Sequence, residues 1–158
     1  MPILIDGHNL IGALDDLSLS DPQDELKLVA RLETYADRVG RPVICVFDAG
    51  PSPPSSEDRR FEGRGIRVRF APPGQEADTV IRRMLDRAPH PKGFLVVSSD
   101  REIQRRARRL RAATMDSRAF ARELSRRPSE ELPPSPKEVG PSPEEVEEWL
   151  RLFREDAG

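Results

Sequence analysis

The chain is poor in the residues that build disulfides and nitrogen- or sulfur-based metal sites. It has one cysteine, Cys45, which can form neither an internal disulfide nor a cage of several thiolates, and this content favours a reducing cytoplasm. Two histidines, His8 and His90, are too few for a histidine-based metal site or to favour a catalytic triad. No GxxxxGK[ST] or GxGxxG loop is present, which argues against nucleoside triphosphate binding.

Long apolar runs are also missing. No stretch approaches the roughly eighteen apolar residues that a membrane span requires, and no basic segment precedes the apolar residues 3–5 at the N-terminus. We therefore expect no membrane partner and no secretory signal. Aromatic residues make up 5% of the chain, so a surface that reads nucleic acid mainly by base stacking is not expected.

What the sequence does have is a strong segregation of charge. The 158 residues carry a net charge of −2, but residues 1–58 hold 4 basic and 11 acidic side chains, residues 59–127 hold 19 and 8, and residues 128–158 hold 3 and 9. Arginine accounts for 23 of the 26 basic residues. A GC-rich genome could explain the preference for arginine over lysine, but not the clustering. A basic central block is typical of a protein that binds a phosphate polymer.

Short apolar runs alternate with amphipathic segments through the first 127 residues. Strands are predicted at 3–5, 43–47, 66–70, 94–97 and 112–115, and helices at 21–39, 77–87, 101–111 and 117–127. Residues 50–57 contain three prolines and are predicted to form a loop. Continuous apolar strands alternating with helices indicate an α/β fold with a parallel sheet covered on both faces. Sites in such sheets lie beyond the carboxyl ends of the strands.

The composition changes after residue 127. Residues 128–143 hold six of the sixteen prolines, which predicts a stiff, extended linker. Ser142 and Pro143 then begin a helix whose apolar residues Val146, Trp149 and Phe153 share one face. This helix packs either on its own domain, the commoner outcome, or on a partner. We divide the chain into a domain at 1–127, a proline-rich linker at 128–142 and an amphipathic helix at 143–156.

Four aspartates occupy equivalent places in this pattern. Asp6, Asp48 and Asp100 follow predicted strands, and Asp78 begins the helix after the third strand. Singly, each is explained as a helix cap or turn residue. Together at one sheet edge they would raise one another's pKa unless a cation neutralised them, and an all-oxygen donor set suits one or two Mg²⁺ or Mn²⁺ ions. Beside an arginine-rich segment, such a site points to phosphodiester chemistry.

Polar neighbours of these aspartates are candidates for supporting roles. Asn9 either donates its amide to a substrate phosphate or a carboxylate, or simply caps a turn. Ser98 and Ser99 can fix a carboxylate or a water molecule, and no paired base makes either of them a nucleophile. His8 lies beside Asp6 and titrates near neutral pH.

The basic block supplies side chains to hold a nucleic-acid backbone. The predicted phosphate contacts are Arg59, Arg60, Arg64, Arg67, Arg69, Arg101 and Arg105. Phe61 can stack on a base. Four further arginines, at 106, 108, 109 and 111, cannot all face one way on a helix, so some are plain solvated surface.

Four motifs, in order, resemble those of the YacP-like branch of the NYN domains. They are Asp6-Gly7-His8-Asn9, Phe47-Asp48-Ala49, Ala77-Asp78-Thr79 and Ser98-Ser99-Asp100, and the resemblance covers about residues 3–125. It implies a PIN-like three-layer α/β sandwich with a mainly parallel sheet of about five strands, and a Mg²⁺- or Mn²⁺-dependent endoribonuclease. It implies metal-site roles for the four aspartates and a supporting role for Asn9. YacP-like proteins are associated with bacterial RNA processing or decay, in some cases at the ribosome.

The sequence departs from this family pattern at three positions. His8 replaces the usual tyrosine, Glu76 stands where threonine is commoner and adds a further candidate acid, and Thr79 stands where many relatives have a second aspartate. Two other functions stay open: a non-catalytic RNA- or ribosome-binding module with a vestigial pocket, and a metal-dependent phosphatase of small substrates, which would not need the arginine block. We expect a monomer or a weak homodimer.

Overall fold

The computed structural model describes residues 2–17, 23–48, 65–125 and 140–155. Its centre is a five-stranded sheet formed by β1 (Ile3–Asp6), β2 (Val43–Phe47), β3 (Ile66–Phe70), β4 (Leu95–Val97) and β5 (Ala113–Met115). The strand order is β3-β2-β1-β4-β5, and every neighbouring pair is parallel. The sequence-based prediction of an α/β fold around a mainly parallel sheet is confirmed.

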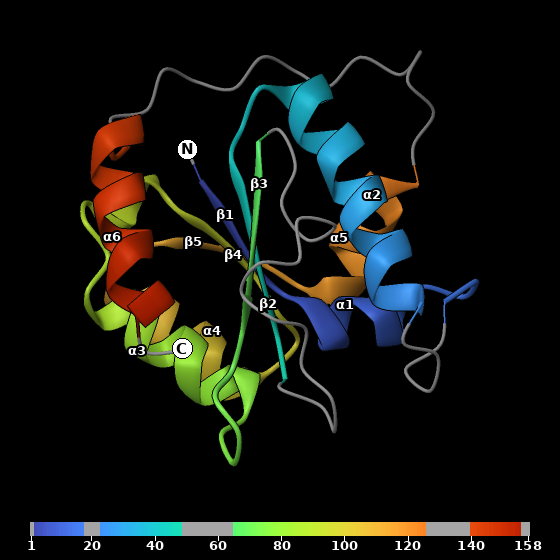
Figure 1. Ribbon diagram of the computed structural model, residues 1–158, viewed down its shortest axis with the longest axis horizontal. Coiled ribbons are helices and arrows are strands. Elements are labelled where there is room, and N and C mark those ends of the chain that lie inside the picture. Colours follow the sequence, from blue (N-terminus) through green and yellow to red (C-terminus); the bar gives the residue numbers. More distant parts are fainter. Residues whose placement is uncertain (1, 18–22, 49–64, 126–139, 156–158) are drawn as a thin grey trace.

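Helices cover both faces of this sheet, so the fold has three layers (Figure 1). On one face lie α1 (Gly7–Ala13), α2 (Gln23–Val39) and α5 (Ser117–Leu124). On the other lie α3 (Ala77–Asp86), α4 (Arg101–Arg109) and α6 (Pro143–Glu155). A short 3-10 turn, η2 (Pro91–Gly93), leads into β4. No helix in these described ranges is both long and apolar enough to cross a membrane.

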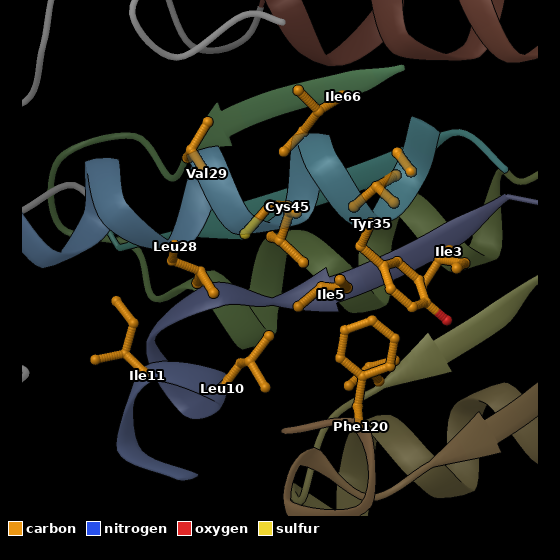
Figure 2. Close-up of a cluster of buried hydrophobic side chains, with 14 of the residues drawn as sticks. Ile3, Ile5, Leu10, Ile11, Leu28, Val29, Tyr35, Cys45, Ile66 and Phe120 are labelled. Atoms are coloured by element: carbon orange, nitrogen blue, oxygen red, sulfur yellow. The ribbon is translucent and has the colours of Figure 1, made fainter. Parts of the chain in front are cut away.

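Each face of the sheet buries its own hydrophobic core because strand side chains alternate between faces. In β1, Ile3 and Ile5 point toward α1, α2 and α5, whereas Leu4 points to the opposite layer. Figure 2 shows the first of these cores, where the ring of Tyr35 from α2 meets that of Phe120 from α5 edge-on, with centroids 5.2 Å apart. Such burial on both faces requires the uninterrupted apolar strands seen in the sequence.

The C-terminal helix α6 belongs to the second core. Val146, Trp149, Leu150 and Phe153 are each at most 5% exposed, and Trp149 Nε1 donates a hydrogen bond of 3.0 Å to the carbonyl of Met84 in α3. The backbone just before α6 packs closely against η2, because a Cβ on Gly93 would lie 2.3 Å from the Cα of Gly140. Of the two outcomes predicted for this helix, packing on its own domain is the one found.

Two short elements escaped the sequence-based prediction. Helix α1 begins directly at Gly7, where we expected only the end of a strand, because seven residues are too few to show helical periodicity. The turn η2 was missed for the same reason. The predicted helix start at Asp21 and Pro22, the loop at 50–57 and most of the linker lie outside the described residues.

A first prediction concerns the packing of α6. Trp149→Ala removes a buried ring and leaves the Met84 carbonyl without its donor, so we expect the free energy of unfolding to fall by about 3 to 5 kcal/mol. Urea titration followed by circular dichroism measures this. Leu152→Ala, on the 49% exposed Leu152 of the same helix, serves as the control and should change stability little. Equal effects of the two substitutions would contradict the packing of α6.

Candidate functional site

The carboxyl edge of the sheet brings together side chains from separate segments of the chain. Strand β1 pairs with β2 on one side and with β4 on the other, and the connections change direction here, which makes the edge beyond β1 and β4 the usual place for a site. Asp6 is the last residue of β1, Asp48 follows β2, and Asp100 follows β4 after two serines.

Asp6 is the buried member of this group. It is 8% exposed, and its pKa is raised from the usual 3.8 to about 6. The largest cause is the loss of water around the carboxylate, opposed by a hydrogen bond from the backbone of Asn9; the charges of Asp48 and Asp100 raise the pKa further. Ionised Asp6 is therefore held at a cost, which a nearby cation would offset.

Asp100 and Ser98 connect β4 to the site. Asp100 Oδ1 caps α4 by accepting hydrogen bonds of 2.8 Å from the Glu102 N–H and 3.2 Å from the Ile103 N–H. Ser98 Oγ accepts a bond of 3.1 Å from the Asp100 N–H and donates a longer one of 3.5 Å to Asp6 Oδ2. Ser98 is 1% exposed, so it links the two aspartates in a fixed position.

Asn9 is held by its side-chain carbonyl. Asn9 Oδ1 accepts hydrogen bonds from the Ser99 N–H at 2.9 Å and from the Ser117 hydroxyl at 2.5 Å. The Ser99 hydroxyl donates to Asp116 Oδ2 at 3.1 Å, which ties the same loop to the cap of α5. With the carbonyl oxygen occupied, the Asn9 amide group is left as a donor with no partner among the described residues.

Asp48 lies between a helix start and a histidine. Its Oδ1 accepts a hydrogen bond of 2.6 Å from the Ala77 N–H at the beginning of α3, and its side chain is 49% exposed. His8 Nδ1 is 3.3 Å from Asp48 Oδ2, and His8 Nε2 is 3.2 Å from Glu25 Oε1. The pKa of His8 is raised, chiefly by the hydrogen bond to Glu25, against the opposing effect of burial.

Asp78 is the second residue of α3. Its Oδ1 is buried and has no hydrogen-bond partner in the part of the chain that the structure describes, and its Oδ2 is 3.6 Å from an Arg82 nitrogen. A buried carboxylate oxygen without a donor is a costly arrangement unless a ligand completes it. Glu76 occupies the N-cap position of α3 but is exposed and makes no side-chain cap, and Thr79 Oγ1 is 3.5 Å from Arg82.

Gly7 is required by the packing behind the site. A Cβ at this position would lie 2.4 Å from a ring carbon of Phe47 and 2.9 Å from the sulfur of Cys45. Glycine therefore lets α1 begin directly against β2, with Asp6 before it and His8 after it. Cys45 is fully buried behind this contact, and burial raises its pKa well above the usual value.

The predicted phosphate-binding arginines fall into different environments. Arg101 and Arg105 are exposed on α4, next to Asp100, and Arg105 pairs with Glu102 at 3.2 Å. Arg67 pairs with Glu147 of α6 at 2.7 Å, and Arg69 is only 9% exposed. Arg59, Arg60, Phe61 and Arg64 lie outside the described residues. The roles of all seven arginines in binding phosphates remain predictions.

The side chains at this edge suit a divalent metal ion in their chemistry. They offer carboxylate oxygens, and the buried Asp6 and the unpartnered Asp78 Oδ1 both favour a nearby cation. In the part of the chain that the structure describes, however, no three histidine, cysteine, aspartate or glutamate side chains are arranged to hold a metal ion together. The residue types at this edge therefore agree with the predicted metal site. The described side chains are not assembled into a set of metal ligands.

Sequence reasoning missed three supporting residues, Glu25, Gln104 and Ser117. Gln104 Nε2 donates a hydrogen bond of 2.8 Å to the Ser98 carbonyl, and Ser117 holds Asn9. Glu25 contacts His8 from α2, 17 positions along the chain. None of these belongs to a motif, and only the tertiary fold brings them to the site.

An α/β sandwich with acidic side chains at the carboxyl edge of a parallel sheet is the arrangement expected of a PIN-like domain. The model of the YacP-like NYN domain matches residues 3–139, and the chain belongs to that family, part of the PIN-like nuclease superfamily. The match extends past residue 125 but ends before α6.

Solved structures share this fold. Rae1 (YacP) from Bacillus subtilis is 24% identical over 78% of this chain and 73% of its own, with a TM-score of 0.64. Its W164L mutant has the same identity and coverage of this chain, with 74% of its own length covered and a TM-score of 0.61. No curated protein matches the chain.

The raised pKa of Asp6 predicts how one substitution changes stability with pH. Because the folded-state pKa of about 6 lies above the usual 3.8, the folded chain binds the extra proton between these values. Stability from this group is therefore present at low pH and lost as the pH rises through about 6. Asp6→Asn removes this loss. We therefore expect the free energy of unfolding of Asp6→Asn, relative to the wild type, to be higher by on the order of 3 kcal/mol above this pH window and unchanged below it.

Urea unfolding of wild-type and Asp6→Asn chains at several pH values, without divalent ions, measures the difference between them. Since both chains share every other titrating group, the difference isolates residue 6. A difference that is flat with pH would show that Asp6 ionises normally in the folded chain.

Proposed function

We propose that the protein is a Mg²⁺- or Mn²⁺-dependent endoribonuclease that acts in bacterial RNA processing or mRNA decay, in the cytoplasm and at the ribosome. The observation that carries the proposal is the buried Asp6 at the end of β1, whose pKa is raised by burial and also by Asp48 and Asp100 from neighbouring segments. Membership of a nuclease superfamily supports the same reaction class.

The four aspartates are the residues that would hold one or two ions, directly or through water. A bound ion would supply Lewis acidity, which activates a water molecule and neutralises charge on the scissile phosphate. The protein's own contribution is placement: Ser98 holds Asp6 and Asp100 in a fixed relation, and the start of α3 holds Asp48. The carbonyl oxygen of the Asn9 side chain is anchored by Ser99 and Ser117, and its amide group would donate to a phosphate oxygen.

Helix α4 offers a path for the RNA backbone leading from this edge. Arg101, Arg105, Arg108 and Arg109 are exposed and follow the spacing i, i+4, i+7, i+8, so they share one face of the helix. Arg106 faces elsewhere and pairs with Asp86 at 2.7 Å. Arginine guanidinium groups bind phosphates without reading bases, so we expect little sequence preference.

A substitution at Asp100 tests the reaction. Asp100→Asn keeps the cap of α4, because asparagine is as good an N-cap as aspartate, but removes the negative charge. We expect Mn²⁺-dependent cleavage of structured and single-stranded RNA to fall by at least about a hundredfold. Asp116→Asn is the matched control, since Asp116 caps α5 in the same way, with a 2.9 Å bond to the Arg118 N–H. That variant should retain cleavage.

Cleavage that survives Asp100→Asn would rule out the carboxylate mechanism. Binding of RNA without cleavage by the wild-type chain would instead favour the non-catalytic RNA-binding module.

The α4 path predicts a salt-dependent affinity. We expect RNA binding to weaken steeply as salt rises, and the double substitution Arg101→Gln with Arg108→Gln to lower the slope of log affinity against log salt by about 1 to 2. Fluorescence anisotropy with a labelled RNA measures both. Arg106→Gln, which alters the arginine paired with Asp86, is the control. A slope that the double variant shares with the wild type would show that α4 does not contact phosphates.

A further inference from the structure

Glu25 reaches the carboxyl edge of the sheet, where Asp6 and Asp48 lie, from a helix that carries none of the predicted site residues. It lies in the first turn of α2, and its side chain is 24% exposed, as His8 is at 22%. Glu25 Oε1 is 3.2 Å from His8 Nε2. The other ring nitrogen, Nδ1, faces Asp48.

The two contacts of His8 define which of its nitrogens carries hydrogen when the ring is neutral. In the neutral ring the Asp48 N–H donates a bond of 3.2 Å to Nδ1, so Nδ1 is the acceptor there; Asp48 Oδ2, 3.3 Å from the same nitrogen, accepts from it only when the ring is protonated. Nε2 must then carry the hydrogen and donate it to Glu25. The ring of Phe47 packs against His8 with centroids 5.1 Å apart, which leaves the imidazole little freedom to turn.

The contact between Glu25 and His8 acts on the rest of the site through Asp48. Its backbone is held by His8, and its Oδ1 holds the Ala77 N–H at the start of α3, next to Asp78. Only a side chain with a donor on one side and an acceptor on the other, as the two nitrogens of a neutral histidine ring provide, can face both Glu25 and the Asp48 N–H from this position. The arrangement therefore depends on the histidine of this chain.

We propose that Glu25 is a positioning residue: by accepting the Nε2 hydrogen of His8, it keeps Nδ1 directed at the Asp48 N–H and so holds Asp48 and the start of α3 in place to bind a divalent cation. The last clause rests on the proposed function; the positioning itself does not. An outer partner that orients a histidine in this way commonly tunes a metal site that it does not touch.

The test compares Glu25→Ala with Glu25→Gln in the full chain. Alanine removes the acceptor, whereas glutamine keeps an acceptor oxygen at the same reach without the charge. By NMR at a pH above the titration of the His8 ring, followed in each chain by its ring-carbon shifts, we expect the Asp48 amide hydrogen to exchange roughly tenfold faster in Glu25→Ala and near the wild-type rate in Glu25→Gln. Glu33→Ala, on the same helix and away from His8, should leave this rate unchanged.

A Mn²⁺ titration of the same chains gives the second measurement. We expect roughly tenfold weaker binding in Glu25→Ala and rescue in Glu25→Gln. Unchanged Asp48 exchange in Glu25→Ala, or equal acceleration in Glu33→Ala, would overturn the positioning role. A wild-type chain that binds no Mn²⁺ would overturn the metal and the proposed function, and the exchange rates would still decide whether Glu25 positions Asp48.

Discussion

Parallel pairing of β1 with both β2 and β4 is the constraint on which the rest of the structure depends. It sets the ends of three strands at one edge, so residues more than 40 positions apart, such as Asp6 and Asp48, become neighbours. It also buries both faces of β1, which deprives the carboxylate at its end of water. The same packing that stabilises the sheet thus creates an acidic group that ionises at a cost.

The acidic residues at this edge also carry structural duties. Asp100 caps α4, and Asp48 holds the first turn of α3. Each uses one carboxylate oxygen to fix the protein and leaves the other directed elsewhere. An aspartate that is anchored in this way loses little further freedom when it binds a ligand, which is how rigid sites gain affinity.

Much of the fold could be predicted because its pattern is local. Short apolar runs identified β1, β2 and β4, alternation of apolar residues with arginines identified β3, and the apolar face of residues 146–153 identified α6. The aspartates could be grouped because parallel strands share an edge. Helix α1 was missed because it is too short for periodicity, and Glu25 because nothing in the sequence relates it to His8. The pairing of Arg67 with Glu147 joins segments 80 positions apart and likewise has no local signal.

Strand β3 is at one edge of the sheet, and in the described residues it pairs only with β2. Such an edge offers unpaired backbone groups to any other extended chain. Here arginines alternate with apolar residues along the strand, with Arg69 turned inward and nearly buried and Arg67 bonded to α6. Charged residues on an edge strand are one of the devices by which proteins avoid edge-to-edge pairing, and β3 carries two of them.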